Sequence, residues 1–177
     1  VVHRDLKPAN ICFTKSGEFK ILDLGLARDI ERDLETETYS GTPAYSSPEQ
    51  AACRPTDGRS DQYALALIVF EMLTGKKAFT DVNLLCLLNK QIEDPPPRPR
   101  DLVPELPEAT ERAILRALSK NPEERYVSCR EFAHDLGDFP GGTERSHVVP
   151  IPADKRIGFY IAHVADESLL ARQLGRA

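Results

Sequence analysis

Near the start of the chain, the segment HRDLKPAN places three kinds of polar side chain at short spacing. Asp5 offers a carboxylate, Lys7 an ammonium group and Asn10 an amide oxygen. A second carboxylate, Asp23, follows two short β-prone runs that we expect to pair as a hairpin and return it to the same place. Phosphoryl transfer needs a carboxylate that receives a hydroxyl proton, oxygen ligands for Mg²⁺ and positive charge near the transferred group. The four side chains supply this set.

Turn and helix signals predict the elements that position these residues. Residues 11–14 and 19–22 are the β-prone runs, and Gly17 between them suits a tight turn. Residues 23–49 are polar and lack periodicity, which predicts a long loop. Ser60 is a candidate N-cap for a helix over 61–74 that is apolar almost all round and ends at Gly75, so we place this helix at the centre of the domain.

Three more helices are expected downstream. One covers residues 82–92 and leads into the proline-rich segment 94–107, which we interpret as a stiff connection, with a ligand for a proline-binding domain as the alternative. The last one begins with a capping box at Ser128 and Glu131 and ends at Gly137. The middle helix lies between the proline-rich segment and Ser128, and its apolar stripe consists of Ala109, Ala113, Ile114, Ala117 and Leu118.

Composition excludes several classes of protein. The chain has 177 residues, of which 41% are hydrophobic and 29% charged, as in globular domains. The net charge of -5 disfavours nucleic-acid binding, and the longest apolar run, from Tyr63 to Phe70, is too short to cross a bilayer. The four cysteines are far apart and form no C-x-x-C pair, which fits a reducing cytoplasm better than a disulfide framework or a zinc site.

The motifs HRDLKPAN, DLG, GTPAY and SPEQ, in this order, resemble those of eukaryotic-type protein kinases, and most closely the bacterial serine/threonine branch. The resemblance implies a mainly α, protein-kinase-like C-lobe over residues 1–137, with a small β-hairpin at the active site. It implies that Asp5 is the catalytic base and that Lys7 steadies the γ-phosphate of ATP, as in serine/threonine kinases. Asn10 and Asp23 would hold Mg²⁺.

Further roles follow from the same resemblance. Thr42 in GTPAY would help form the groove for the substrate hydroxyl, and Cys12 would lie beneath the adenine ring. Lys7, Asn10 and Asp23 would also contact the nucleotide.

Residues 23–49 become the activation segment in this interpretation. Thr36 and Thr38 would be regulatory phosphothreonines, whose phosphates Arg4 and Arg28 would bind. The alternative is that both threonines are solvated loop residues.

The remaining matches imply structural roles. Glu49 and Arg125 resemble a buried ion pair that ties the activation segment to the helical lobe. Asp61 resembles a carboxylate that holds the backbone of the catalytic loop, and His3 and Leu24 would pack in line above it.

The resemblance places the ATP-binding half of the family upstream of Val1, so we expect the chain to be a fragment whose isolated form binds ATP poorly. Residues 138–154 contain several glycines and prolines and predict a linker. Residues 155–177 read as one strand and one helix, the first β-α unit of a second α/β domain, and resemble the opening of a TIR domain. The alternative is another parallel α/β domain.

The leading hypothesis is a protein kinase that transfers the γ-phosphate of Mg-ATP to serine or threonine. Its partners would be ATP and protein substrates, with TIR-type partners through the tail, and no nucleic acid. Two alternatives stay open, a regulatory pseudokinase or scaffold, and a control module for a TIR-type signalling protein. The charge set of Asp5, Lys7, Asn10 and Asp23 favours the enzyme, because a binding module does not need it.

Overall fold

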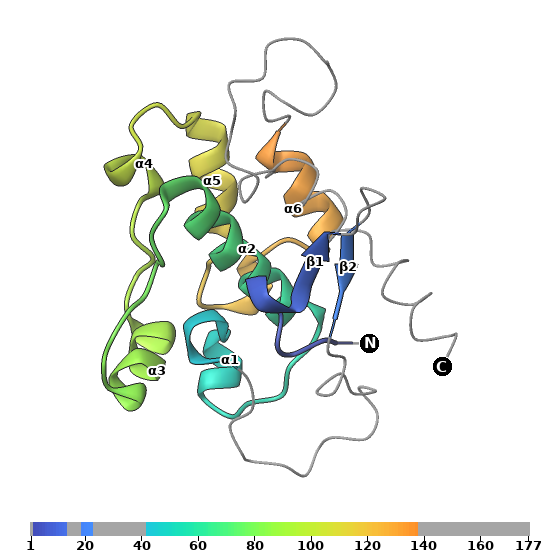
Figure 1. Ribbon diagram of the computed structural model, residues 1–177, viewed down its shortest axis with the longest axis vertical. Coiled ribbons are helices and arrows are strands. Elements are labelled where there is room, and N and C mark those ends of the chain that lie inside the picture. Colours follow the sequence, from blue (N-terminus) through green and yellow to red (C-terminus); the bar gives the residue numbers. More distant parts are fainter. Residues whose placement is uncertain (1, 14–18, 23–41, 138–177) are drawn as a thin grey trace.

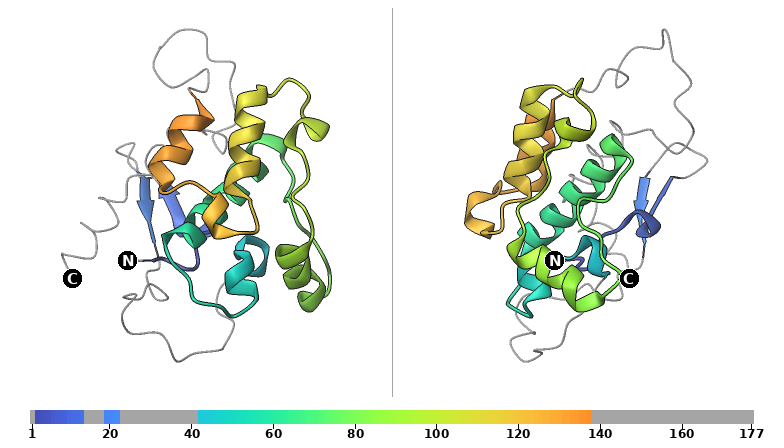
Figure 2. Two further views of the ribbon diagram at one scale, coloured as in Figure 1. Left: turned by 180° about the vertical axis from the view of Figure 1, so that it is seen from behind. Right: turned by 90° about the vertical axis from the view of Figure 1, so that its left-hand side faces the viewer.

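The structure is a computed structural model, and it describes residues 2–13, 19–22 and 42–137. Within these residues the fold is mainly helical and has one small antiparallel sheet, as the sequence predicts. Helix α2, Gly58–Thr74, lies at the centre, and the hairpin of β1, Ile11–Phe13, and β2, Phe19–Ile21, lies to one side of it (Figure 1). Helices α5, Glu108–Ala117, and α6, Cys129–Leu136, pack side by side (Figure 2). Helix α1, Pro48–Ala51, packs against α3, Leu84–Glu93.

Helix α2, Gly58–Thr74, is the buried core of this fold. All residues from Tyr63 to Phe70 are buried, which confirms the prediction from its composition. The helix ends at Gly75, whose φ of 70° lies in the left-handed region that glycine adopts without strain. The predicted N-cap is wrong, because Asp57 caps the helix three residues earlier by accepting the N–H of Arg59 at 2.8 Å.

The predicted hairpin is formed by β1, Ile11–Phe13, and β2, Phe19–Ile21. Cys12 pairs with Lys20, and Ile11 pairs with Ile21. The N–H of Leu22 donates to the carbonyl of Asn10 at 2.7 Å and so extends the pairing to the loop that precedes β1. The hairpin therefore ties the segment that carries Asp5, Lys7 and Asn10 to Leu22.

Helices α5, Glu108–Ala117, and α6, Cys129–Leu136, close the core on one side. Ser128 caps α6 by accepting the N–H of Glu131 at 3.2 Å. The side chain of Glu131 reaches the N–H of Val127 instead of Ser128, so only half of the predicted capping box forms. In α5, Ala109 is exposed and Thr110 is buried, because the Thr110 hydroxyl finds a partner in the carbonyl of Leu136 at 3.3 Å.

The described part contains three further α-helices. Helix α3, Leu84–Glu93, matches the expected helix, and Asn83 caps it. Two short helices were not expected from the sequence, α1 at Pro48–Ala51 and α4 at Pro99–Leu102 within the proline-rich connection. Each has proline in its first turn, where the missing N–H costs nothing.

A buried ion pair joins α1 to the loop before α6. The guanidinium of Arg125 donates to both carboxylate oxygens of Glu49, each at 2.8 Å. Arg125 also donates to the backbone carbonyls of Arg59 and Ser119, and Ser60 donates to Glu49 at 2.6 Å. Because both charges are only slightly exposed and well supplied with hydrogen bonds, losing either partner would leave the other charge buried without compensation.

Arg125→Met should therefore lower the free energy of unfolding by about 3–5 kcal/mol. Arg112 forms an ion pair with Glu108 on the surface, where both side chains are about two-thirds exposed. Arg112→Met is the matched control and should cost less than about 1 kcal/mol. Chemical denaturation of the full-length protein that contains this chain measures both values, and equal losses would contradict the assignment.

The same pair predicts a pH dependence of stability. Burial acts to raise the pKa of Glu49, but hydrogen bonds and charge from Arg125 and the hydroxyl of Ser60 outweigh it, so its pKa lies below the ordinary 4.5. The stabilisation is therefore complete above pH 4.5 and is lost as the pH falls through the lower folded value. The difference in melting temperature between wild type and Glu49→Gln should shrink in that acid range, and a constant difference would refute the link.

Candidate catalytic site

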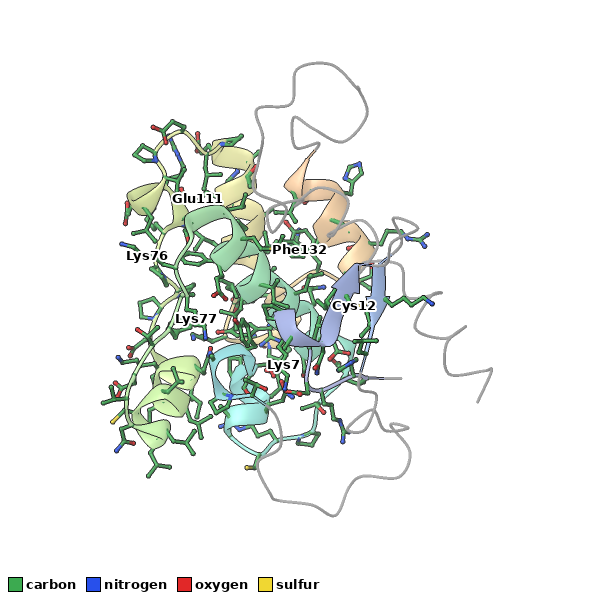
Figure 3. The ribbon with its side chains drawn as sticks, viewed as in Figure 1. Lys7, Cys12, Lys76, Lys77, Glu111 and Phe132 are labelled. Atoms are coloured by element: carbon green, nitrogen blue, oxygen red, sulfur yellow. The ribbon has the colours of Figure 1, made fainter. Side chains whose placement is uncertain are left out.

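Four polar side chains from two distant segments meet in one cluster. Lys7 donates to one carboxylate oxygen of Asp5 at 2.5 Å and to the hydroxyl of Thr42 at 2.9 Å. That hydroxyl donates to the other oxygen of Asp5 at 2.7 Å. Asn10 donates its amide to the backbone carbonyl of Asp5 at 2.8 Å and to its carboxylate at 3.2 Å. In Figure 3, Cys12 lies on β1, the strand that follows the segment with Lys7.

The charge state of Asp5 follows from these contacts. Partial burial acts to raise the pKa of its carboxyl group, whereas hydrogen bonds from Lys7, Thr42 and Asn10 lower it, and the net pKa lies below the usual 3.8. At neutral pH the carboxylate is therefore ionised and can accept a hydrogen bond from a hydroxyl group.

The local backbone explains the spacing of these residues. Pro8–Asn10 forms a single 3-10 turn, in which the N–H of Asn10 donates to the carbonyl of Lys7 at 3.0 Å. Proline begins the turn, where its fixed φ is favourable. Lys7 and Asn10 therefore lie at the two ends of one turn, and both side chains reach Asp5.

The backbone around Arg4 is strained and is held from two sides. Arg4 has a φ of 67°, in the left-handed region, which costs a residue other than glycine about 1–3 kcal/mol. Asp61 on α2 accepts the N–H groups of His3 and Arg4 at 2.7 and 2.9 Å. Gln50 on α1 donates to the carbonyl of Arg4 at 2.7 Å. These three bonds fix the turn from which the Asp5 side chain projects.

His3 links the loop to the hairpin. Its Nδ1 accepts the N–H of Asp5 at 3.3 Å, so the neutral ring carries its proton on Nε2. Nε2 lies 3.1 Å from the carbonyl of Leu22 and donates to it. Because His3 is buried, with 1% of its surface exposed, this ring fixes how the end of β2 sits relative to Asp5.

Asn10 has the chemistry of a Mg²⁺ ligand. Both hydrogen bonds of its side chain are donated by the amide nitrogen, and within the described residues the amide oxygen makes none. Amide and carboxylate oxygens suit this hard cation. Among the described residues, no group of three or more Asp, Glu, His or Cys side chains could hold a metal ion, and Asp23, the expected second ligand, lies outside them.

A turn from Thr42 to Ser46 adjoins the cluster. Pro43–Tyr45 forms a 3-10 helix, and the Ser46 hydroxyl donates to the carbonyl of Thr42 at 3.1 Å. The hydroxyl of Tyr45 donates to Glu71 on α2 at 2.6 Å. The turn is thereby attached to the central helix.

Two glutamines that the sequence reasoning missed support this site. Gln50 forms a capping box with Ser47, for which SPEQ carries the signal, and it also reaches the Arg4 carbonyl. Gln91 on α3 donates to the carbonyls of Pro43 and Ala44 at 3.2 and 3.3 Å. No sequence pattern marks Gln91, because its partners lie far away in the chain.

Several expected site residues lie outside the described residues. They are Asp23, Leu24, Arg28, Thr36 and Thr38, and the tail from 138 to 177 is outside as well. Cys12 is half-buried on β1. In the described part of the chain, no helix is both long and apolar enough to span a membrane.

Comparison with known proteins agrees with the motif order. The family model described as protein kinase domain matches residues 1–136. The probable serine/threonine-protein kinase PknB of Corynebacterium glutamicum is 35% identical over 145 residues, which cover 77% of this chain and 22% of that protein. The serine/threonine-protein kinase Pkn1 of Myxococcus xanthus is 40% identical over 144 residues, 77% of this chain and 21% of that protein.

A third relative, the tyrosine-protein kinase MasK of Myxococcus xanthus, is 38% identical over 141 residues, which cover 78% of this chain and 22% of that protein. The chain thus spans about a fifth of the length of these curated relatives. The family match extends over most of the chain and includes every member of the polar cluster. The chain belongs to the protein kinase family.

Proposed function

We propose that this chain provides the catalytic-loop part of a serine/threonine protein kinase that uses Mg-ATP. The observation that carries the proposal is the cluster in which an ionised Asp5 is hydrogen-bonded to Lys7, Asn10 and the Thr42 hydroxyl. The Thr42 hydroxyl shows that the carboxylate can accept a hydrogen bond from an alcohol at 2.7 Å. A substrate serine or threonine would present the same group to it.

In the proposed reaction, the substrate hydroxyl oxygen forms a bond to the γ-phosphorus of ATP. The bond from that phosphorus to the β–γ bridging oxygen breaks, ADP leaves, and the hydroxyl proton passes to Asp5. Lys7 places its ammonium group beside Asp5, where it would contact the γ-phosphate. Mg²⁺, held by Asn10 and Asp23, would neutralise charge on the phosphates, and Cys12 would line the adenine site.

The choice of serine and threonine over tyrosine as acceptors rests on Lys7 and on the two relatives named as serine/threonine kinases. A relative named as a tyrosine kinase has similar identity, and acceptor choice is therefore measured on a peptide that offers serine, threonine and tyrosine. A synthetic peptide with the sequence of residues 30–46 offers all three types of hydroxyl acceptor. It contains threonine at 36 and 38, tyrosine at 39 and serine at 40.

Asp5→Asn in the full-length protein should reduce kcat for phosphorylation of this peptide by roughly 10²–10⁴-fold, because the general base is lost. The KM for ATP should change little. Asp101 is an exposed carboxylate on α4, so Asp101→Asn is the matched control and should behave as wild type. A folded Asp5→Asn protein that retains wild-type kcat would overturn the proposal, as would a wild type that transfers no phosphate.

We further propose that residues 23–49 form an activation segment regulated at Thr36 and Thr38, although its last part is not the loop that the sequence predicts, because Pro43–Tyr45 is a 3-10 helix and α1 begins at Pro48. A phosphate on either residue would accept charge-assisted hydrogen bonds from Arg4 and Arg28. Arg4 immediately precedes Asp5, so such a bond would connect the phosphate to the strained turn that carries the proposed base.

Thr36→Ala combined with Thr38→Ala should lower kcat/KM by about tenfold or more, the equivalent of one charge-assisted hydrogen bond. The variant should also lose phosphate from this segment, measured by mass spectrometry of the full-length protein. Thr80→Ala, at an exposed site, provides the control. Unchanged activity in the double variant would favour the view that both threonines are ordinary loop residues.

For the C-terminal part we propose a linker at 138–154 and the start of a TIR-like domain at 155–177. The support is the sequence pattern alone, and the kinase match ends at residue 136. A first β-α unit of another α/β domain is the alternative, and a solved structure of residues 138–177 in the full-length protein would discriminate between them. Cytoplasmic location is likewise a proposal, supported by Cys12, Cys53 and Cys86 being free thiols.

A further inference from the structure

Gln91 occupies an unusual place for an amide side chain. It lies on α3 with 0% of its surface exposed, three residues after the buried Leu88, on the face where an apolar residue would be expected. A buried amide is costly unless its hydrogen bonds are satisfied. Its burial is therefore tolerated only if both its amide nitrogen and its amide oxygen have partners.

Both ends of the Gln91 side chain are used. The amide nitrogen donates to the carbonyls of Pro43 and Ala44 at 3.2 and 3.3 Å. The amide oxygen accepts the hydroxyl of Tyr63, on α2, at 3.2 Å. One side chain thus joins α3, the central helix and the turn that begins at Thr42.

Lys120 holds the backbone of Gln91. Its ammonium group donates to the backbone carbonyls of Gln91 and Lys90 at 2.6 and 3.2 Å, and to the Tyr63 hydroxyl at 3.2 Å. It also lies over the ring of Phe79, 4.3 Å from the centroid. The backbone and the side chain of Gln91 are therefore both held in place. The amide nitrogen can in turn fix the position of the Pro43 and Ala44 carbonyls.

The turn that Gln91 holds leads directly to the proposed catalytic cluster. Pro43 follows Thr42, whose hydroxyl bridges Asp5 and Lys7 at 2.7 and 2.9 Å. Tyr45, at the other end of the turn, is bound to Glu71. Two separate side chains on helices thus set the position of four consecutive residues beside Asp5.

We propose that Gln91 is a positioning residue for the protein substrate, which sets the Thr42–Tyr45 turn against Asp5 through the carbonyls of Pro43 and Ala44. This inference rests on the proposed function, because it takes the turn to be part of the surface that receives the acceptor peptide. Gln91 itself touches neither ATP nor the acceptor in this role. Its loss affects recognition of the acceptor and leaves the nucleotide site as it was.

Gln91→Met keeps the length of the side chain but removes the amide bonds, and is tested in the full-length protein. We expect about a tenfold rise in the KM for the peptide of residues 30–46, the effect of losing one to two net hydrogen bonds. The KM for ATP and the slow transfer of phosphate to water should stay at wild-type values. Asn89→Met, at an exposed amide two residues earlier on the same helix, should change none of these constants.

The outcomes separate the possibilities. A purely structural role of Gln91 would lower the melting temperature and reduce transfer to water and to peptide alike, and would overturn the inference, as would an unchanged peptide KM. If Gln91→Met does not fold, Tyr63→Phe decides, because it removes the hydroxyl that orients the Gln91 oxygen and should raise the same KM by a smaller factor. If the wild-type protein phosphorylates the peptide and both variants have the same peptide KM as the wild type, this inference is refuted. The proposed function then remains intact.

Discussion

Two backbone N–H groups, those of His3 and Arg4, donate to the carboxylate of Asp61, and the geometry of the site depends on this interaction. Asp61 lies in the first turn of a helix whose next turns are fully buried, so its position is fixed by the core. Because the carboxylate accepts both groups, Arg4 can keep a left-handed conformation that would otherwise be unfavourable. The next residue is Asp5, whose side chain is thereby placed relative to the core.

Other buried polar contacts connect the segment after residue 41 to the same frame. Gln50 binds the carbonyl of Arg4, and the neighbouring Glu49 is paired with Arg125. Helix α1, which carries both residues, has only four residues and could not be stable alone. Its contacts to the loop and to the ion pair stabilise it, so the strained loop and the short helix depend on each other.

The turn at Thr42–Tyr45 is attached in a similar way. Gln91 on α3 holds its carbonyls, and Glu71 on α2 holds the hydroxyl of Tyr45. Buried polar networks whose hydrogen bonds are all satisfied rigidify a structure and specify one arrangement. Polar groups buried at helix junctions therefore account for the placement of a turn that has little apolar surface of its own.

The sequence alone predicted the elements whose signals are local. Signals within a few residues along the chain predict the apolar helix that ends at Gly75, the hairpin of β1 and β2 and the cap at Ser128. Motif order predicted that Asp5, Lys7, Asn10 and Thr42 belong together. Signals of similar local strength compete, which is why Asp57 and not Ser60 begins α2.

Only the tertiary structure decided which buried polar groups find partners. The sequence predicts Ala109 on the inner face of α5, but Thr110 is the buried residue, and its hydroxyl donates to the carbonyl of Leu136 on α6. The left-handed turn at Arg4 and the burial of Gln91 likewise need Asp61, Gln50 and Tyr63, which are distant in the chain. Hydrogen bonds between residues far apart in the chain leave no periodic pattern in the sequence. They form, and constrain the structure, only once the helices have packed.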